Sequence, residues 1–244
     1  MLTARKGLSM MACVGLVAFL GSCGTPSSQA EWSGGGDTTR FANSTQERIM
    51  TLLKKEDMDD SQIRMLEHAL ANDGKVSAAD YLTAWDNYRQ CMVGKGYTAP
   101  TMHNINGIYI HQTKMDASNL SEAQQEKISR DNNDCKSTYM LAVDDVYRIN
   151  VANPEMYRDP DVALVDCLRR HNLVPKSYTV RQYKAEWDKF VDADVSDTRS
   201  EREAYALRRR EFGFDFNDPQ VRTCVVTNDS NLLLDELEGW KPFG

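Results

Sequence analysis

Residues 77–97, SAADYLTAWDNYRQCMVGKGY, decide the fold class because they contain every signal of a complete helix. Ser77 is a favoured N-cap residue, and Gly96 stands where a left-handed residue commonly ends a helix. Between them, large side chains recur at spacings of four, three and four, so they share one helical face. These side chains are Tyr81, Trp85, Tyr88 and Met92. The stretch therefore predicts an amphipathic helix with an aromatic face in the core.

Similar signals run along most of the chain from about residue 39 onward. Capping Ser, Thr and Asp residues and Asp-Pro pairs predict further helix starts. They stand at Ser44, Asp60, Ser121, Asp159, Thr179, Asp197 and Asp218. Residues 105–113 are the one segment with a strand-like pattern. We therefore expect a mainly α protein with at most a small strand element.

Four cysteines in the body of the chain predict two disulfides. Cys91 and Cys167 have similar surroundings: an apolar residue follows each, Gly or Asn stands five residues on, and an apolar residue six on. Each is followed by another cysteine in a helical stretch, Cys135 and Cys224 respectively. Three pairings are possible, and this similarity favours Cys91–Cys135 and Cys167–Cys224. A zinc site is disfavoured because the chain contains no Cys-x-x-Cys pair. The similarity also predicts two loosely similar helical halves, 39–152 and 153–244, within one compact domain.

The N-terminus carries the pattern of an export signal. Two basic residues, Arg5 and Lys6, precede an apolar run over 7–20 that is too short to span a bilayer. The run ends in Leu20-Gly21-Ser22-Cys23, which resembles the lipobox of bacterial lipoproteins. That resemblance implies a signal peptide over 1–22 and acylation of Cys23. An ordinary secreted protein, cleaved after Ala30, is the alternative.

The mature chain is then expected to be a lipid-anchored protein on the extracytoplasmic face of the cell membrane. Residues 23–38 contain many Gly and Ser residues and are expected to form a tether. A second resemblance starts at residues 73–81, DGKVSAADY, and continues through Cys91 and Gly96. This segment is similar to one in secreted and lipid-anchored proteins of high-GC Gram-positive bacteria, and the similarity implies no particular activity.

Composition excludes one class of partner. The chain has 29 Lys and Arg residues against 36 Asp and Glu residues, a net charge of −7. Nucleic-acid binding needs a basic surface to neutralise phosphates, so this balance argues against it. No stretch of 18 apolar residues occurs, so no transmembrane helix is expected.

Candidate sites in the sequence are few. Residues 192–203 place oxygen-bearing side chains at positions one, three, five and twelve of a calcium loop, but position six is Asp197 instead of Gly. Those four residues, Asp192, Asp194, Ser196 and Glu203, form a weak calcium candidate. His103 and His111 flank the strand-like segment, and neighbouring carboxylates such as Asp144 and Asp145 point to different helical faces.

No catalytic residue and no cofactor is assigned from the sequence. The anchor, the tether and the lack of a catalytic motif favour a non-catalytic binding or interaction role at the cell envelope. The expected partners are the membrane, through the lipid anchor, and an envelope protein or cell-wall component. The alternatives are an envelope enzyme, such as a wall-directed hydrolase, and a transporter-associated solute-binding lipoprotein.

Overall fold

The computed structural model describes residues 34–228 and 231–244. The expected signal peptide, the expected acylation site Cys23 and the first part of the expected tether lie outside the described residues. The elements of the described chain are α2 (Thr45–Leu52), α3 (Asp60–Ala71), α4 (Ala78–Gly94), β1 (Asn104–Ile105), β2 (Ile108–Tyr109), α5 (Glu122–Tyr139), α6 (Leu141–Ala152), α7 (Pro160–Arg170), α8 (Val180–Asp192), α9 (Glu201–Arg208), α10 (Pro219–Thr227) and the 3-10 helices η1 (Arg209–Glu211) and η2 (Asn231–Glu236).

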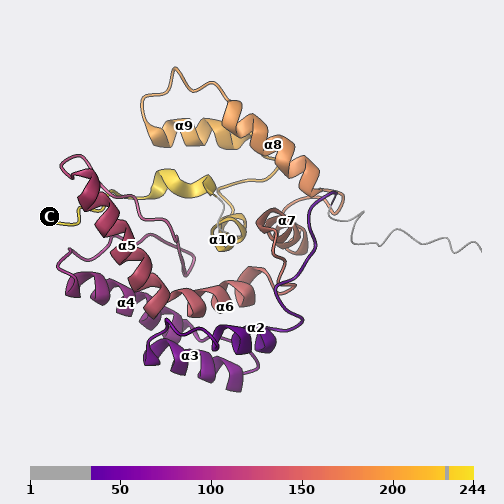
Figure 1. Cartoon of the computed structure of the whole chain (residues 1–244). Helices are drawn as coiled ribbons and strands as arrows, with labels where there is room; N and C mark the ends of the chain where they lie inside the picture. The colour runs from indigo at the N-terminus through magenta and orange to yellow at the C-terminus, as the bar shows by residue number, and fades with distance from the viewer. Residues whose placement is uncertain (1–33, 229–230) are drawn as a thin grey trace, which may run out of the picture.

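Helix α6 is the centre of the fold. It contacts α2, α3, α4 and α5 from the first half of the chain, and α7 and α10 from the second half. In Figure 1, α2, α3, α4 and α6 lie at the bottom, α8 and α9 lie at the top, and α7 and α10 are seen nearly end-on between them. The mainly α class predicted from the sequence is confirmed.

The strand element is smaller than the strand-like segment suggests. β1 and β2 pair antiparallel, with Asn104 opposite Tyr109 and Ile105 opposite Ile108. Asn106 and Gly107 make the turn with φ of 51° and 91°, the left-handed conformation of a tight hairpin. Residues 110–113 form no strand.

Both disulfides predicted from the sequence are present. Cys91–Cys135 joins α4 to α5, and Cys167–Cys224 joins α7 to α10. The similar surroundings of Cys91 and Cys167 also correspond to similar geometry. Each helix ends at a left-handed residue, Gly96 with φ 92° and Asn172 with φ 56°, and the next amide donates back to a carbonyl five residues earlier, as in a Schellman cap.

Three predicted helix starts differ in detail. The cap of α3 is Asp59 and not Asp60, because the Asp59 carboxylate accepts from the Ser61 amide at 2.8 Å. Helix α9 starts after Ser200 and not at Asp197, because the Ser200 hydroxyl accepts from the Glu203 amide. At Ser44 only half of a capping box forms. The Ser44 hydroxyl accepts from the Glu47 amide, but the Glu47 carboxylate accepts from the Asn43 amide and not from that of Ser44.

The chain breaks between α5 and α6 without Gly or Pro. Met140 has φ −141° and ψ −30°, which ends one helix and begins the next. Gln62 of α3, fully buried, satisfies both ends of this break. Its amide donates to the carbonyls of Ser137 and Thr138 at 2.9 and 2.8 Å, and its oxygen accepts from the Ala142 amide at 2.8 Å.

The buried apolar residues form two large clusters, which follow the two halves only in part. One contains the aromatic face of α4 and also Trp240 from the C-terminal segment. The other contains α7, α8 and α10, and also Ile105 and Ile108 of the hairpin. Each cluster therefore contains residues from both halves of the chain.

The start of the described chain is packed and leads directly into α2. A Cβ added to Gly36 would lie 2.4 Å from a methyl carbon of Val162, so only glycine fits there. The Phe41 amide then donates to the Met156 carbonyl at 2.9 Å. Residues 34–38, which the sequence assigns to the tether, thus lie against α7 and α8. Over the described residues, no helix is long and apolar enough to cross a bilayer.

Candidate functional site

A charged group lies at the centre of the molecule. Asp144 of α6 is fully buried and accepts hydrogen bonds from three side chains. The Trp85 indole donates at 3.0 Å and the Arg148 Nε at 2.6 Å, and the His111 Nε2 also contacts the carboxylate. Burial by itself would raise the pKa of Asp144, but the positive charge of Arg148 and the contact with His111 outweigh it and lower the pKa. The carboxylate is therefore ionised and fixed.

Arg148 extends this network into the second half of the chain. The residue is 5% exposed, and its guanidinium donates to the backbone carbonyls of Val226 and Tyr109, with a longer contact to Thr227 at 3.4 Å. The Asp144–Arg148 pair on α6 thus holds the end of α10 and the hairpin together. Its chemistry is that of a buried, hydrogen-bonded ion pair that fixes geometry.

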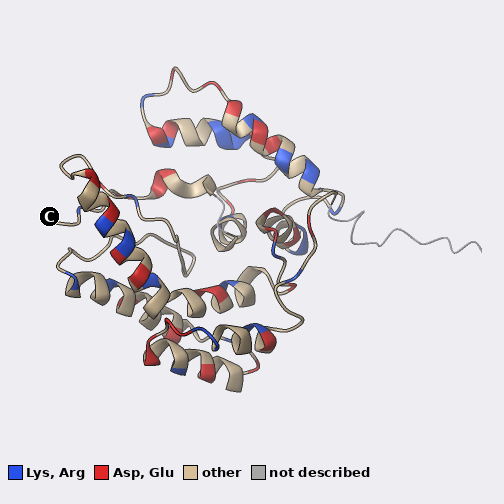
Figure 2. Cartoon of the chain, viewed as in Figure 1, with Lys and Arg blue, Asp and Glu red and all other residues tan. Residues whose placement is uncertain are grey.

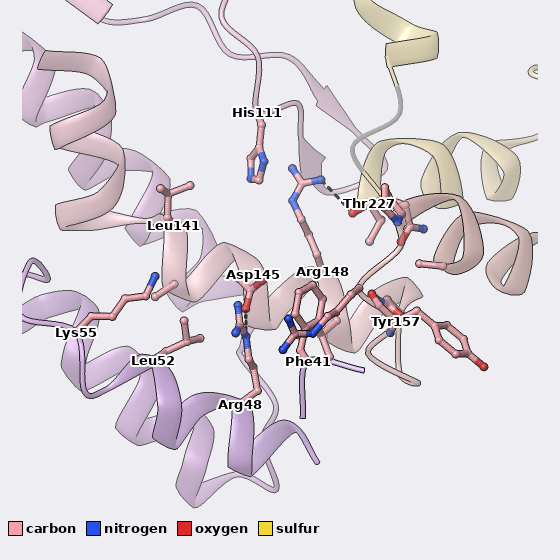
Figure 3. A pocket seen from close by; sticks show the side chains of 17 residues that line it. Phe41, Arg48, Leu52, Lys55, His111, Leu141, Asp145, Arg148, Tyr157 and Thr227 are labelled. Atoms are coloured by element: carbon pink, nitrogen blue, oxygen red, sulfur yellow. Dashed lines mark hydrogen bonds and ion pairs between the residues drawn. The ribbon is translucent and has the colours of Figure 1, made fainter. Parts of the chain in front are cut away.

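A cleft opens on one side of this network. Its volume is about 440 Å³, within the range of small-molecule sites. The C-terminal end of α2, one face of α6, the start of α7 and the end of α10 form its walls. Figure 3 shows His111, Arg148 and Thr227 on the side of the network, and Leu52, Lys55 and Leu141 opposite.

Apolar side chains form much of the cleft surface. Leu52, Ala142, Ile149 and Ala163 are buried there, and Leu141 is 39% exposed. An exposed leucine at the mouth of a cleft presents apolar surface to water, which a ligand would cover.

Three cationic side chains surround the outer part of the cleft. Arg48 and Arg158 both lie over the ring of Phe41, at 4.8 and 5.8 Å from its centroid. Arg48 pairs with Asp145 at 2.8 Å, and Figure 3 shows this pair between α2 and α6. No carboxylate of the described residues lies within ion-pair distance of Lys55 or Arg158.

The charge of the cleft is opposite to that of the chain. Its described lining contains four Lys and Arg side chains and one carboxylate, Asp145. The four cationic residues are Arg48, Lys55, Arg148 and Arg158. The whole chain carries −7, and Figure 2 shows acidic and basic residues interspersed along α5 and α8. The cleft therefore concentrates positive charge in an acidic protein.

One polar atom in the wall lacks a partner within the described structure. The hydroxyl of Thr227, a residue only 5% exposed, is buried and makes no hydrogen bond to any described residue. A buried, unsatisfied hydroxyl costs free energy.

The candidate residues from the sequence lie apart. His103 contacts Glu236 at 3.2 Å, whereas His111 contacts Asp144, so the two histidines do not form a common site. Among the described residues, no group of three His, Cys, Asp or Glu side chains able to hold a metal occurs. In the calcium candidate, Asp194 accepts from the Ser196 amide at 2.9 Å, and Glu203 accepts from the Arg199 amide at 2.8 Å.

The cleft itself was not predicted from the sequence. One signal for its inner wall was present: α6 is apolar on most sides, yet carries Asp144 and Arg148 four residues apart. A helix that is apolar all round is buried, and a buried Asp and Arg at that spacing pair with each other. The outer cations gave no such signal, because Phe41, Arg48 and Arg158 meet only through tertiary packing.

Comparisons with protein-family models, curated proteins and solved structures found no match. The function is therefore argued from the chain and its cleft.

Proposed function

We propose that this chain is a lipid-anchored extracytoplasmic protein that binds a small molecule in the cleft between α2, α6, α7 and α10. The lipobox pattern ending at Cys23 and the two disulfides support the compartment, since disulfides persist in oxidising environments. The cleft supports the binding role.

The observation that carries this proposal is the cleft itself, which has a volume of about 440 Å³ and a largely apolar surface. The Arg148 guanidinium in its wall is engaged, donating to Asp144 and to backbone carbonyls. The inner wall is thus held rigid by this buried ion pair. This is a preorganised site.

The charged groups favour binding over hydrolysis. A glycoside hydrolase uses two carboxyl groups across the scissile bond. The described lining of this cleft has one carboxylate, Asp145, and Arg48 holds it at 2.8 Å. The cleft therefore gives no support to the wall-directed hydrolase.

The binding role is tested with a neutral apolar dye, N-phenyl-1-naphthylamine, whose fluorescence rises in apolar sites. We expect saturable binding to the mature chain carrying Cys23→Ser, which has no acyl chains to bind the dye. Adding Leu141→Glu is expected to abolish this binding, because it places a charge at the apolar mouth of the cleft. Met50→Glu is the matched control, because Met50 is 49% exposed and does not line the cleft. Equal loss in both variants, or no binding to the parent chain, would contradict the binding role.

The anchor is tested separately by Cys23→Ser. The lipobox requires the thiol of Cys23 for acylation, so the variant is expected to leave the detergent phase and enter the aqueous phase. Two acyl chains give the stable anchoring expected of the parent protein. A variant that still partitions with lipid would disprove the anchor without affecting the dye result.

A further inference from the structure

The cleft combines two features that select different parts of one ligand. Lys55 and Arg158 are exposed cations at its mouth without a carboxylate within ion-pair distance among the described residues. Leu52, Ile149 and Ala163 are buried apolar side chains further in. A ligand that satisfies both needs an anionic group and an apolar body.

Two of the outer cations, Arg48 and Arg158, pack against the ring of Phe41. The backbone of residues 39–41 pairs with that of 156–158: the Phe41 amide donates to Met156, and the Arg158 amide donates to Thr39, each at 2.9 Å. The Arg158 Nε donates to the Arg40 carbonyl at 3.1 Å, which leaves the terminal nitrogens of its guanidinium for another acceptor. An anion at this position would meet donors that are already oriented.

The position of the cleft in the chain agrees with a ligand derived from the membrane. Phe41 lies in the cleft wall, only a short segment after Gly36, which packs against α7. On the proposed anchoring at Cys23, the chain between Cys23 and Gly34 spans at most about 3.6 Å per residue, which limits the distance between the cleft and the lipid surface.

We infer that the cleft binds an anionic amphiphile, in which a phosphate or carboxylate head lies at Lys55, Arg48 and Arg158 and an apolar chain lies against Leu52, Ile149 and Ala163. This inference rests on the proposed binding role and adds the ligand class. A cationic amphiphile is excluded from the same position by charge repulsion, and an inorganic anion alone leaves the apolar surface uncovered.

The test compares three probes by calorimetry on the mature chain carrying Cys23→Ser, so that no protein-bound lipid competes. The probes are octyl phosphate, octyltrimethylammonium and inorganic phosphate. We expect octyl phosphate to bind at least about ten-fold more tightly than the other two, because it alone uses both the cations and the apolar surface. Its affinity is also expected to fall as salt concentration rises.

A double variant, Lys55→Gln and Arg158→Gln, is expected to weaken octyl phosphate binding by about ten-fold or more and to weaken binding of the neutral dye much less. Lys54→Gln is the matched control, because Lys54 is the exposed neighbour of Lys55 and does not line the cleft. Melting temperatures of all variants establish that each is folded.

The outcomes separate the inference from the proposed function. Equal affinity for octyl phosphate and octyltrimethylammonium would overturn the anionic head, and equal affinity for octyl phosphate and inorganic phosphate would overturn the apolar chain. In both cases dye binding that depends on Leu141 would leave the binding role intact. Absence of both dye and octyl phosphate binding would contradict the binding role itself.

Discussion

At the scale of single residues, the inner wall of the cleft contains one satisfied polar group and one unsatisfied group side by side. Arg148 donates to Asp144 and to the carbonyls at the end of α10. Thr227, in the last turn of α10, keeps a buried hydroxyl without a partner among the described residues. The simplest explanation is that this hydroxyl costs the ligand-free fold some stability.

Thr227→Val tests that explanation. The valine removes the unsatisfied hydroxyl and keeps the branched shape, so we expect the free energy of unfolding to rise by about 1 kcal/mol in the ligand-free chain. Urea unfolding measures this change. A loss of stability of the same size would mean that the hydroxyl already has a partner, such as an ordered water molecule.

Asp144 gives a prediction about pH. Since Arg148 and His111 lower its pKa in the folded state despite burial, its ionised form stabilises the fold. This stabilisation is complete above the ordinary pKa of 3.8 and is lost as the pH falls towards about 2. Asp144→Asn leaves Arg148 buried without its counter-charge and is expected to cost about 3–5 kcal/mol near neutral pH.

Urea unfolding of the parent chain and of Asp144→Asn, compared from neutral pH down to about pH 2, measures that contribution. We expect the stability difference between the two proteins to shrink over the acid range. A difference that stays constant with pH would show that the charge of Asp144 contributes nothing to stability.

At the scale of elements, the sequence predicts most helices because their signals are local. The Asp159-Pro160 and Asp218-Pro219 pairs do begin α7 and α10, and Ser121 and Thr179 make full capping boxes. The predicted disulfide pairing is confirmed. It could be predicted because Cys91 and Cys167 stand at equivalent distances before equivalent helix ends.

The break at Met140 was not predictable in this way. It contains no residue that ends a helix, and the groups that stabilise it come from Gln62, far away in the sequence. The cleft was not predictable for the same reason: its cationic side chains come from segments that are far apart in the sequence. Local signals therefore account for the elements, and tertiary hydrogen bonds and packing account for the break and the site.

Gln62→Leu tests the role of this glutamine. The leucine fills a similar space but leaves the carbonyls of Ser137 and Thr138 and the amide of Ala142 without their partner. We expect a loss of about 2–4 kcal/mol in the free energy of unfolding, since each buried group left unsatisfied costs about 1–3 kcal/mol. Urea unfolding of the parent chain and of the variant measures this loss.

The matched control for this change is Glu67→Leu, on the exposed side of the same helix. It introduces the same side chain without removing a buried hydrogen bond, so we expect it to change stability little. An equal loss of stability in the two variants would show that the hydrogen bonds of Gln62 do not hold the break between α5 and α6.

At the scale of the whole molecule, α6 connects the two clusters and also lines the cleft. Its Asp144 side faces the buried network, and Asp145 faces Arg48 at the cleft. A ligand in the cleft would therefore contact α2, α6 and α10 together, and α6 and α10 contact each other across the two halves of the chain.

The most direct test of this account is a map of backbone amide chemical shifts of the mature Cys23→Ser chain during titration with octyl phosphate. We expect the largest changes in four separate segments that line the cleft, residues 41–55, 141–153, 157–163 and 225–228, with little change in α9 (Glu201–Arg208). Changes confined to α9, or spread evenly over the surface, would contradict the assignment of this cleft as the binding site.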